Sequence, residues 1–252
     1  AALCGLLARS CAHAQLHPST TEIAAYTGLF AAAIRGDAAE ITRLIAQSAD
    51  VKARDGHNRT ALHVAAHGGH QDAVRALVKG GLPVLEITLR TKAALECIRA
   101  IIAEVEGAIV GAGTVLDGKK LKETEHIGCA FAVSPGATKA LLDSAEDVIV
   151  PLLPGSASAS ECMSLMERGY RFQKFFPAEV AGGVPYLASL ASPLPQVSFC
   201  PTGGITLESA PRYLKLSNVI TVGGSWMVPR KLIEANDWAG IETLAREASK
   251  LK

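Results

Sequence analysis

Hydrophobic and polar positions follow two different rhythms along the chain. From Gly81 onward, short runs rich in β-branched and aromatic residues alternate with longer stretches in which apolar residues recur every three or four positions. The short runs predict strands at Val84–Leu89, Ile109–Val115, Phe131–Ser134, Val148–Leu153, Phe172–Phe176, Gln196–Cys200 and Val219–Val222. The longer stretches predict helices at Lys92–Glu104, Thr138–Ser144, Ala159–Arg168, Gly183–Ala191 and Asp237–Leu251. This alternation predicts an α/β fold with a parallel sheet, one strand short of a closed (β/α)8 TIM-type barrel.

An internal repeat precedes the predicted barrel. The segments LFAAA (29–33) and LHVAA (62–66) lie 33 residues apart, and flanking glycine and apolar positions repeat at the same offset. The second copy, TALHVAAHGGHQDAVRALVKGG from Thr60, resembles the ankyrin repeat, whose period is about 33. We therefore interpret residues 16–80 as ankyrin-like helical repeats, which offer a surface for a protein partner, and residues 81–252 as the barrel.

The first fifteen residues, AALCGLLARSCAHAQ, allow two interpretations. Ala12-His13-Ala14 has the small-x-small pattern of a signal-peptidase site, which would make residues 1–15 the end of a signal sequence. The alternative is an alanine-rich N-terminus without that role. Neither interpretation changes the fold that the rest of the chain predicts.

Composition and charge narrow the function classes. Lys and Arg number 25 against 24 Asp and Glu, so the formal net charge of +1 gives no reason to expect nucleic acid or an anionic membrane as a partner. No apolar run approaches the ~20 residues that cross a bilayer. The six cysteines are scattered, without CxxC or zinc spacing. These features predict a metal-free protein of the reducing cytoplasm.

The first predicted barrel strand carries an acid and a base on one face. Side chains alternate along a strand, so Glu86, Thr88 and Arg90 point one way while the leucines and isoleucine between them point toward the helices. Such a pair is either an ordinary neutralising contact or part of a site inside the barrel.

A lysine on another strand favours the site. In RFQKFFP (171–177), Phe172, Lys174 and Phe176 share a face, so the lysine is predicted to lie between two aromatic rings. A lysine in apolar surroundings loses hydration and gives up its proton more readily. The free amine is a nucleophile that forms a Schiff base with a ketone. The alternative is a lysine that extends from the strand end into water.

Two glycine-rich turns complete the candidate chemistry. CPTGGI (200–205) and VGGS (222–225) follow the last two predicted strands. In a barrel of this kind the loops after strands seven and eight commonly bind phosphate, because glycines let backbone N–H groups approach the anion. The two turns therefore predict a phosphate site, with a pair of ordinary tight turns as the alternative.

Seven ordered motifs carry a resemblance over residues 76–251. They are VLEITLRT (84–91), VGAGTV (110–115), SPG (134–136), PLLPG (151–155), KFFPAE (174–179), CPTGGI (200–205) and GGSWMVP (223–229). Together they resemble the class I 2-keto-3-deoxy-6-phosphogluconate (KDPG) aldolases, which also cleave 4-hydroxy-2-oxoglutarate. The resemblance implies a Schiff-base enzyme that acts on a small phosphorylated 2-keto acid, needs no cofactor and forms a homotrimer.

The resemblance also implies a role for each matching residue. Lys174 would form the Schiff base, Glu86 would move protons, and Thr202 would orient the substrate. Arg90 and Thr114 would hold the carboxylate. The remaining substrate-binding residues would be Pro135 and Phe176 in the pocket wall, and Gly203, Gly204, Gly224 and Ser225 at the phosphate.

The N-terminal part of the predicted barrel departs from this family. The family begins with a strand and a helix before the strand that bears the glutamate, whereas here that place is taken by residues 61–81. We expect Leu62–Ala66 to be helical, because alanine favours helix, which would leave a gap beside the Glu86 strand. Two alternatives to a KDPG aldolase stay open: an ankyrin-type binding module with an inactive barrel remnant, and the related 2-dehydro-3-deoxy-6-phosphogalactonate aldolase.

Overall fold

The chain divides into two compact units. The computed structural model describes residues 18–35, 37–50, 52–56, 71–91 and 93–251. The units are Ala1–Ala73 and Val74–Lys252, with the division inside a helix over residues 71–79. Two expectations, the fate of residues 1–15 and the helical state of Leu62–Ala66, lie outside the described residues.

The first unit contains the short helices α1 (Thr20–Ala25), α2 (Gly28–Ile34) and α3 (Ala38–Ala46), of which α1 and α3 have side-chain N-caps. Ser19 and Glu22 form a capping box at the start of α1. Asp37 caps α3 by accepting the Glu40 N–H at 2.9 Å. Helices α2 and α3 pack together, with the alanines Ala32 and Ala33 buried. The first predicted repeat, LFAAA, is therefore helical.

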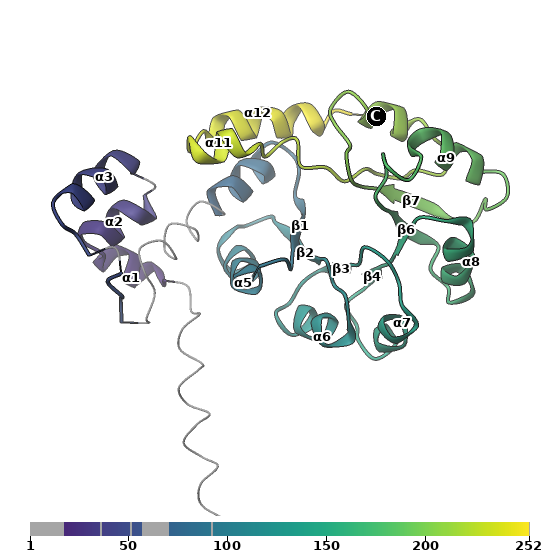
Figure 1. Cartoon of the computed structure of the whole chain (residues 1–252), viewed down its shortest axis with the longest axis horizontal. Helices are drawn as coiled ribbons and strands as arrows, with labels where there is room; N and C mark the ends of the chain where they lie inside the picture. The colour runs from purple at the N-terminus through teal and green to yellow at the C-terminus, as the bar shows by residue number, and fades with distance from the viewer. Residues whose placement is uncertain (1–17, 36, 51, 57–70, 92, 252) are drawn as a thin grey trace, which may run out of the picture. The chain divides into compact units, whose positions relative to one another are not determined.

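The second unit alternates strands and helices, as the hydrophobic pattern predicts (Figure 1). Its strands are β1 (Val84–Thr88), β2 (Ile109–Gly113), β3 (Phe131–Val133), β4 (Leu152–Leu153), β5 (Gly155–Ser156), β6 (Phe172–Phe175) and β7 (Ser198–Pro201). Its named helices are α5 (Ala94–Glu104), α6 (Gly118–His126), α7 (Lys139–Ala145), α8 (Ala159–Glu167), α9 (Gly183–Leu190), α10 (Ala210–Leu214), α11 (Arg230–Glu234) and α12 (Trp238–Ala248). None of the helices in the described part of the chain is long and apolar enough to cross a membrane.

The strands are parallel and form two hydrogen-bonded sheets. One has the order β1-β2-β3-β4 and the other β5-β6-β7, with Pro154 between β4 and β5. Proline has no N–H to donate to a ladder, which fits its place at the division. The predicted strand Val219–Val222 is less regular than expected: it forms only isolated bridges, from Val219 to Phe199 and from Gly223 to Thr202.

Helices cover the outer face of the strands, and their apolar sides form the core. On β1, Leu85 is buried against this layer while Glu86 points to the opposite side. Around β6 and β7, the rings of Phe175 and Phe199 meet edge to face with centroids 6.2 Å apart, and both side chains are fully buried. Phe175 also stacks on Tyr186 of α9. The alternation of each strand therefore leaves its other face for the interior of the barrel.

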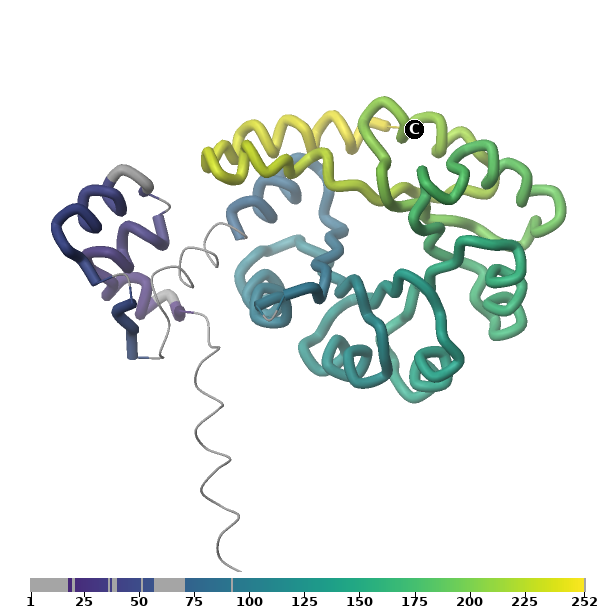
Figure 2. The backbone as a smooth tube through the Cα atoms, viewed as in Figure 1, coloured from purple at the N-terminus to yellow at the C-terminus, as the bar shows by residue number. Residues whose placement is uncertain are grey.

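The last helix of the second unit, α12, packs against the end of the helix over residues 71–79, which precedes β1. A Cβ at Gly80 would overlap Ala245, and Lys79 Nζ lies 2.8 Å from Glu242 Oε2. Figure 2 shows α12 running beside this segment. Among the described residues, however, β1 pairs with β2 alone. The helices at the two ends of this unit are thus in contact, whereas no described strand closes the barrel on the free side of β1.

Candidate active site

Lys174 and Glu86 face each other inside the barrel. Lys174 Nζ lies 3.4 Å from Glu86 Oε1, although 88 residues separate them in the chain. The Lys174 side chain is only 9% exposed, and the Glu86 side chain is 28% exposed. Burying an ammonium group is costly unless an opposite charge accompanies it. Glu86 supplies that charge, and it also places a proton acceptor within reach of the amine.

The aromatic environment of Lys174 is one-sided. Its ammonium lies 5.2 Å from the centroid of the Phe176 ring, a cation–π distance. Phe172, which was expected on the other side, begins β6 and is 59% exposed. The lysine is therefore bounded by one ring and by the neighbouring strands.

Cys200 is the strand neighbour of Lys174 that the sequence did not single out. The two residues are register partners on β6 and β7, so their side chains share a face. Burial raises the pKa of the Cys200 thiol to about 11, the nearby Lys174 charge opposes this rise, and the Glu86 charge adds to it. Cys200 is therefore a neutral thiol at pH 7 and leaves Lys174 as the nucleophile of this face.

Gly113 makes room for the Glu86 carboxylate. A Cβ at Gly113, the last residue of β2, would overlap Glu86 Oε1 and lie 2.6 Å from its carboxyl carbon. We expect Gly113→Ala to leave the chain folded, because a flexible side chain can move aside, but to displace the carboxylate from Lys174. A displacement of about 1 Å can cost roughly 10²-fold in rate, measured as kcat/KM.

Gly56→Ala is the matched control for this substitution, since a Cβ there would meet no atom within 4 Å. Unchanged activity in Gly113→Ala would show that the position of Glu86 is not critical.

Arg90 follows β1 and is oriented by Thr88. Thr88 Oγ1 accepts a hydrogen bond from Arg90 Nε at 3.0 Å, which leaves the two terminal nitrogens of Arg90 for an anionic ligand. Thr114 follows β2 with φ +59°, a left-handed conformation that is strained for a β-branched residue. Such strain is typical of functional sites. Arg90 and Thr114 thus follow the carboxyl ends of the paired strands β1 and β2, on the carboxyl-terminal side of Glu86.

The two glycine turns present unused backbone donors. Gly203 and Gly204 have φ values of +99° and +80°, which only glycine adopts readily. Across the described residues, the N–H groups of Gly204, Gly224 and Ser225 have no hydrogen bond to a protein acceptor. Gly223 N–H donates to Pro201 O at 2.9 Å and joins the two turns. The turns therefore form one cluster of free donors, as an anion site requires.

Thr202 adjoins the glycine turns through its bridge to Gly223, whereas Pro135 lies against Gly155 of β5. Thr202 Oγ1 is buried and has no hydrogen-bond partner in the described structure. A buried hydroxyl without a partner is unfavourable, and a ligand that bonds to it removes that cost. Pro135 follows β3, where a Cβ at Gly155 would overlap its carbonyl group. Glycine at 155 thus allows the loop that carries Pro135 to approach β5 closely.

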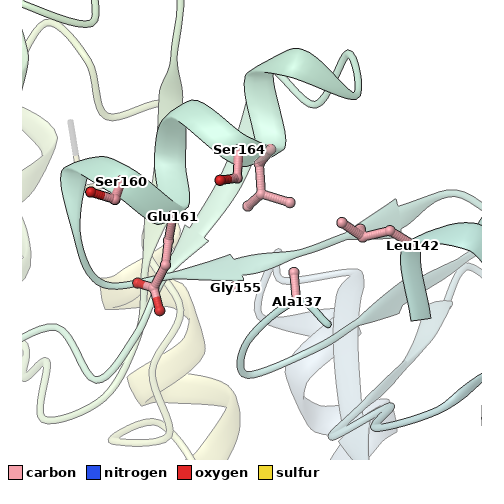
Figure 3. Close-up of a pocket in the computed structure, with 7 residues that line it drawn as sticks. Ala137, Leu142, Gly155, Ser160, Glu161 and Ser164 are labelled. Carbon is pink, nitrogen blue, oxygen red and sulfur yellow. The ribbon is translucent and has the colours of Figure 1, made fainter. Parts of the chain in front are cut away.

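A separate pocket lies outside the barrel between α7 and α8 (Figure 3). It is lined by Ala137, Leu142, Gly155, Ser160, Glu161, Ser164 and Leu165. Its carboxylate, Glu161, accepts hydrogen bonds from Ala157 N–H and Ser158 Oγ at the start of α8, and these bonds lower the pKa of Glu161. Glu161 therefore serves as a hydrogen-bond acceptor at the start of α8, and the structure directs it away from the Lys174 site. No group of three or more His, Cys, Asp or Glu side chains in the described ranges is arranged to hold a metal ion.

The fold and site together define a class I aldolase: a buried lysine beside a carboxylate, inside a parallel TIM-type α/β unit. The family model for KDPG and KHG aldolase matches residues 60–244, and that for ankyrin repeats (3 copies) matches residues 2–88. The chain therefore belongs to the KDPG and KHG aldolase family, with ankyrin repeats at its N-terminus. The two matches overlap over residues 60–88.

Relatives and solved structures agree with this assignment. The KHG/KDPG aldolase of Escherichia coli strain K12 is 51% identical over 174 residues, which are 69% of this chain and 82% of that protein. The KDPG aldolase of Zymomonas mobilis ZM4, solved with 3-phosphoglycerate, is 50% identical with a TM-score of 0.70, covering 74% of this chain and 87% of that one. The Legionella pneumophila KDPG aldolase, with pyruvate captured as a covalent carbinolamine, is 41% identical with a TM-score of 0.71, covering 73% and 89%.

Proposed function

We propose that this chain reversibly cleaves KDPG to pyruvate and glyceraldehyde 3-phosphate, and that it also cleaves 4-hydroxy-2-oxoglutarate. The observation that carries the proposal is the buried Lys174 ammonium 3.4 Å from the Glu86 carboxylate. The E. coli and Z. mobilis relatives, which carry KDPG aldolase names at about 50% identity, support the choice of substrate over the phosphogalactonate epimer.

In this reaction Lys174 attacks the C2 ketone through its free amine, and the carbinolamine loses water to become a protonated imine. Glu86 gives and takes the protons of these steps. When the C3–C4 bond breaks, its electron pair moves into the imine, while the C4 hydroxyl loses its proton to Glu86 and becomes the aldehyde. Protonation of the enamine and hydrolysis of the imine release pyruvate and restore Lys174. The carbinolamine of the L. pneumophila protein corresponds to the first adduct.

The remaining residues bind the two ends of the substrate. We assign the carboxylate to Arg90, through its two terminal nitrogens, and to Thr114. The phosphate would accept hydrogen bonds from the N–H groups of Gly203, Gly204 and Gly224 and from the Ser225 hydroxyl. Thr202 would orient the substrate through its unpartnered hydroxyl, with Pro135 and Phe176 as pocket walls.

Borohydride trapping with pyruvate tests the proposal. Reduction of the imine should leave a 1-carboxyethyl group on the lysine nitrogen, and mass mapping should place it on the peptide that contains Lys174. A protein that forms no adduct would be a barrel remnant without activity, and the ankyrin-type binding function would then stand alone. Cleavage assays with KDPG and its galactonate epimer separate the two enzyme alternatives.

We also propose a setting and partners for the enzyme. The cysteines in the described residues (Cys97, Cys129, Cys162 and Cys200) are free thiols, which supports a reducing cytoplasm. We expect a homotrimer, as the family resemblance implies, and a protein partner for the residues that match ankyrin repeats.

A further inference from the structure

The loop after β6 and the loop after β7 are joined by backbone hydrogen bonds. Thr202 N–H donates to Phe175 O at 2.9 Å, Ala178 N–H to Thr202 O at 2.8 Å, and Glu179 N–H to Gly203 O at 3.2 Å. The parallel ladder of the two strands therefore continues beyond their ends. The position of the Gly203–Gly204 turn depends on the segment that ends at Glu179.

The Glu179 side chain packs against this turn. A Cβ at Gly204 would lie 2.9 Å from Glu179 Cγ and 3.0 Å from Glu179 Cβ. The carboxylate extends to α10, where Tyr213 Oη donates a hydrogen bond to Glu179 Oε1 at 2.8 Å. Glu179 thus spans from the glycine turn to the helix that follows it.

Tyr213 is a fixed anchor for Glu179. The residue is fully buried. Burial, together with its hydrogen bond to Glu179, raises the pKa of Tyr213, so the phenol stays protonated and keeps donating. A Cβ at Gly183, the first residue of α9, would lie 3.3 Å from Tyr213 Oη. The hydroxyl is therefore enclosed by α9, α10 and Glu179.

We propose that Glu179 and Tyr213 are positioning residues that hold the Gly203–Gly204 turn in its phosphate-binding conformation, and so set the preference for phosphorylated over unphosphorylated substrates. The inference rests on the proposed function, because it takes these glycines to bind the substrate phosphate. Glu179 acts through the turn, since its carboxylate is directed to Tyr213. A phosphate held by backbone N–H groups is sensitive to the turn's conformation, whereas Lys174 and Glu86 lie on strands.

The test compares two substrates in the Tyr213→Phe variant. Tyr213→Phe removes the hydroxyl and keeps the buried ring. Loss of a hydrogen bond to a charged group should raise KM for KDPG by about tenfold or more. 4-Hydroxy-2-oxoglutarate has no phosphate, so its kcat and KM should change by less than about twofold by the same argument.

Further variants separate positioning from folding. Glu179→Ala should reproduce the selective effect, whereas Glu179→Gln, whose amide oxygen can still accept from Tyr213, should retain most of the KDPG affinity. Tyr186→Phe is the matched control, because that ring stacks on Phe175 at 5.7 Å in the neighbouring core. We expect it to leave the substrate ratio unchanged.

Two results would overturn the inference: equal losses with both substrates, which would indicate general destabilisation, or an unchanged ratio in both Tyr213→Phe and Glu179→Ala. Failure of the proposed function looks different. The unmodified protein would then form no adduct with pyruvate and cleave neither substrate, and the inference would fall with it.

Discussion

Lys174→Met is expected to abolish turnover while leaving the fold intact. Methionine has a similar volume and suits a side chain that is 9% exposed, so the loss of packing should be small. The nucleophile is lost, and among the named strands β1–β7 Lys174 is the only lysine. Removing a covalent nucleophile can lower kcat by roughly 10⁶-fold, and we expect activity below detection in an assay of pyruvate release.

Lys215→Met, an exposed substitution just after α10, is the matched control and should retain full activity. Circular dichroism should show the same helix content in both variants. Activity in Lys174→Met within about tenfold of the parent would contradict a covalent role, given the losses that such roles produce.

Glu86→Gln should slow the reaction far more than it weakens binding of pyruvate. The amide keeps the shape of the side chain and can accept a hydrogen bond from Lys174, but it does not take up protons. Loss of a positioned acid–base group typically costs about 10²- to 10⁴-fold in kcat. Single-turnover cleavage, measured beside pyruvate binding, separates the two effects.

Glu167→Gln, at the exposed end of α8, is the control for loss of a carboxylate. A fall of less than about fivefold in Glu86→Gln, small beside the usual acid–base contribution, would make Glu86 a structural partner of its neighbours.

The pattern of the sequence predicts the strands and helices well where burial on one face is regular. Four strands, β1, β2, β3 and β6, lie within the predicted runs. In these runs the alternation of side chains and the content of β-branched and aromatic residues both indicate a strand. The helix α6 was missed, since its sequence GKKLKETEH is mostly charged and buries only Leu121 and Thr124. Its Asp117 cap, which accepts the Lys120 N–H, is the local signal that could have revealed it.

The predicted strand Val148–Leu153 was too long. In the structure β4 begins at Leu152, and Ile149 just before it is 94% exposed. A run of apolar residues does not show which of them reach the core. The short strand β5 was also missed, because two residues carry no periodicity.

The site was predictable to the extent that it depends on alternation. Alternation predicts inward-facing side chains for Glu86 and Lys174, and in the structure Lys174 Nζ lies 3.4 Å from Glu86 Oε1. The role of Gly113 is not predictable from the pattern, because it depends on a contact between β2 and Glu86 on β1. The proximity of Cys200 to Lys174 likewise depends on strand register, which a single sequence does not specify.

The division of the strands into two sheets has a consequence for what activity reports. Glu86 belongs to the four-stranded sheet and Lys174 to the three-stranded one, so no strand ladder holds the two side chains together directly. The sheets are linked through the segment from β4 to β5, where Ser134 N–H donates to Leu153 O and Lys174 N–H donates to Pro154 O at 2.9 Å. Enzyme activity therefore reports how accurately β2 to β5 place β6 opposite β1, as well as the presence of the two side chains.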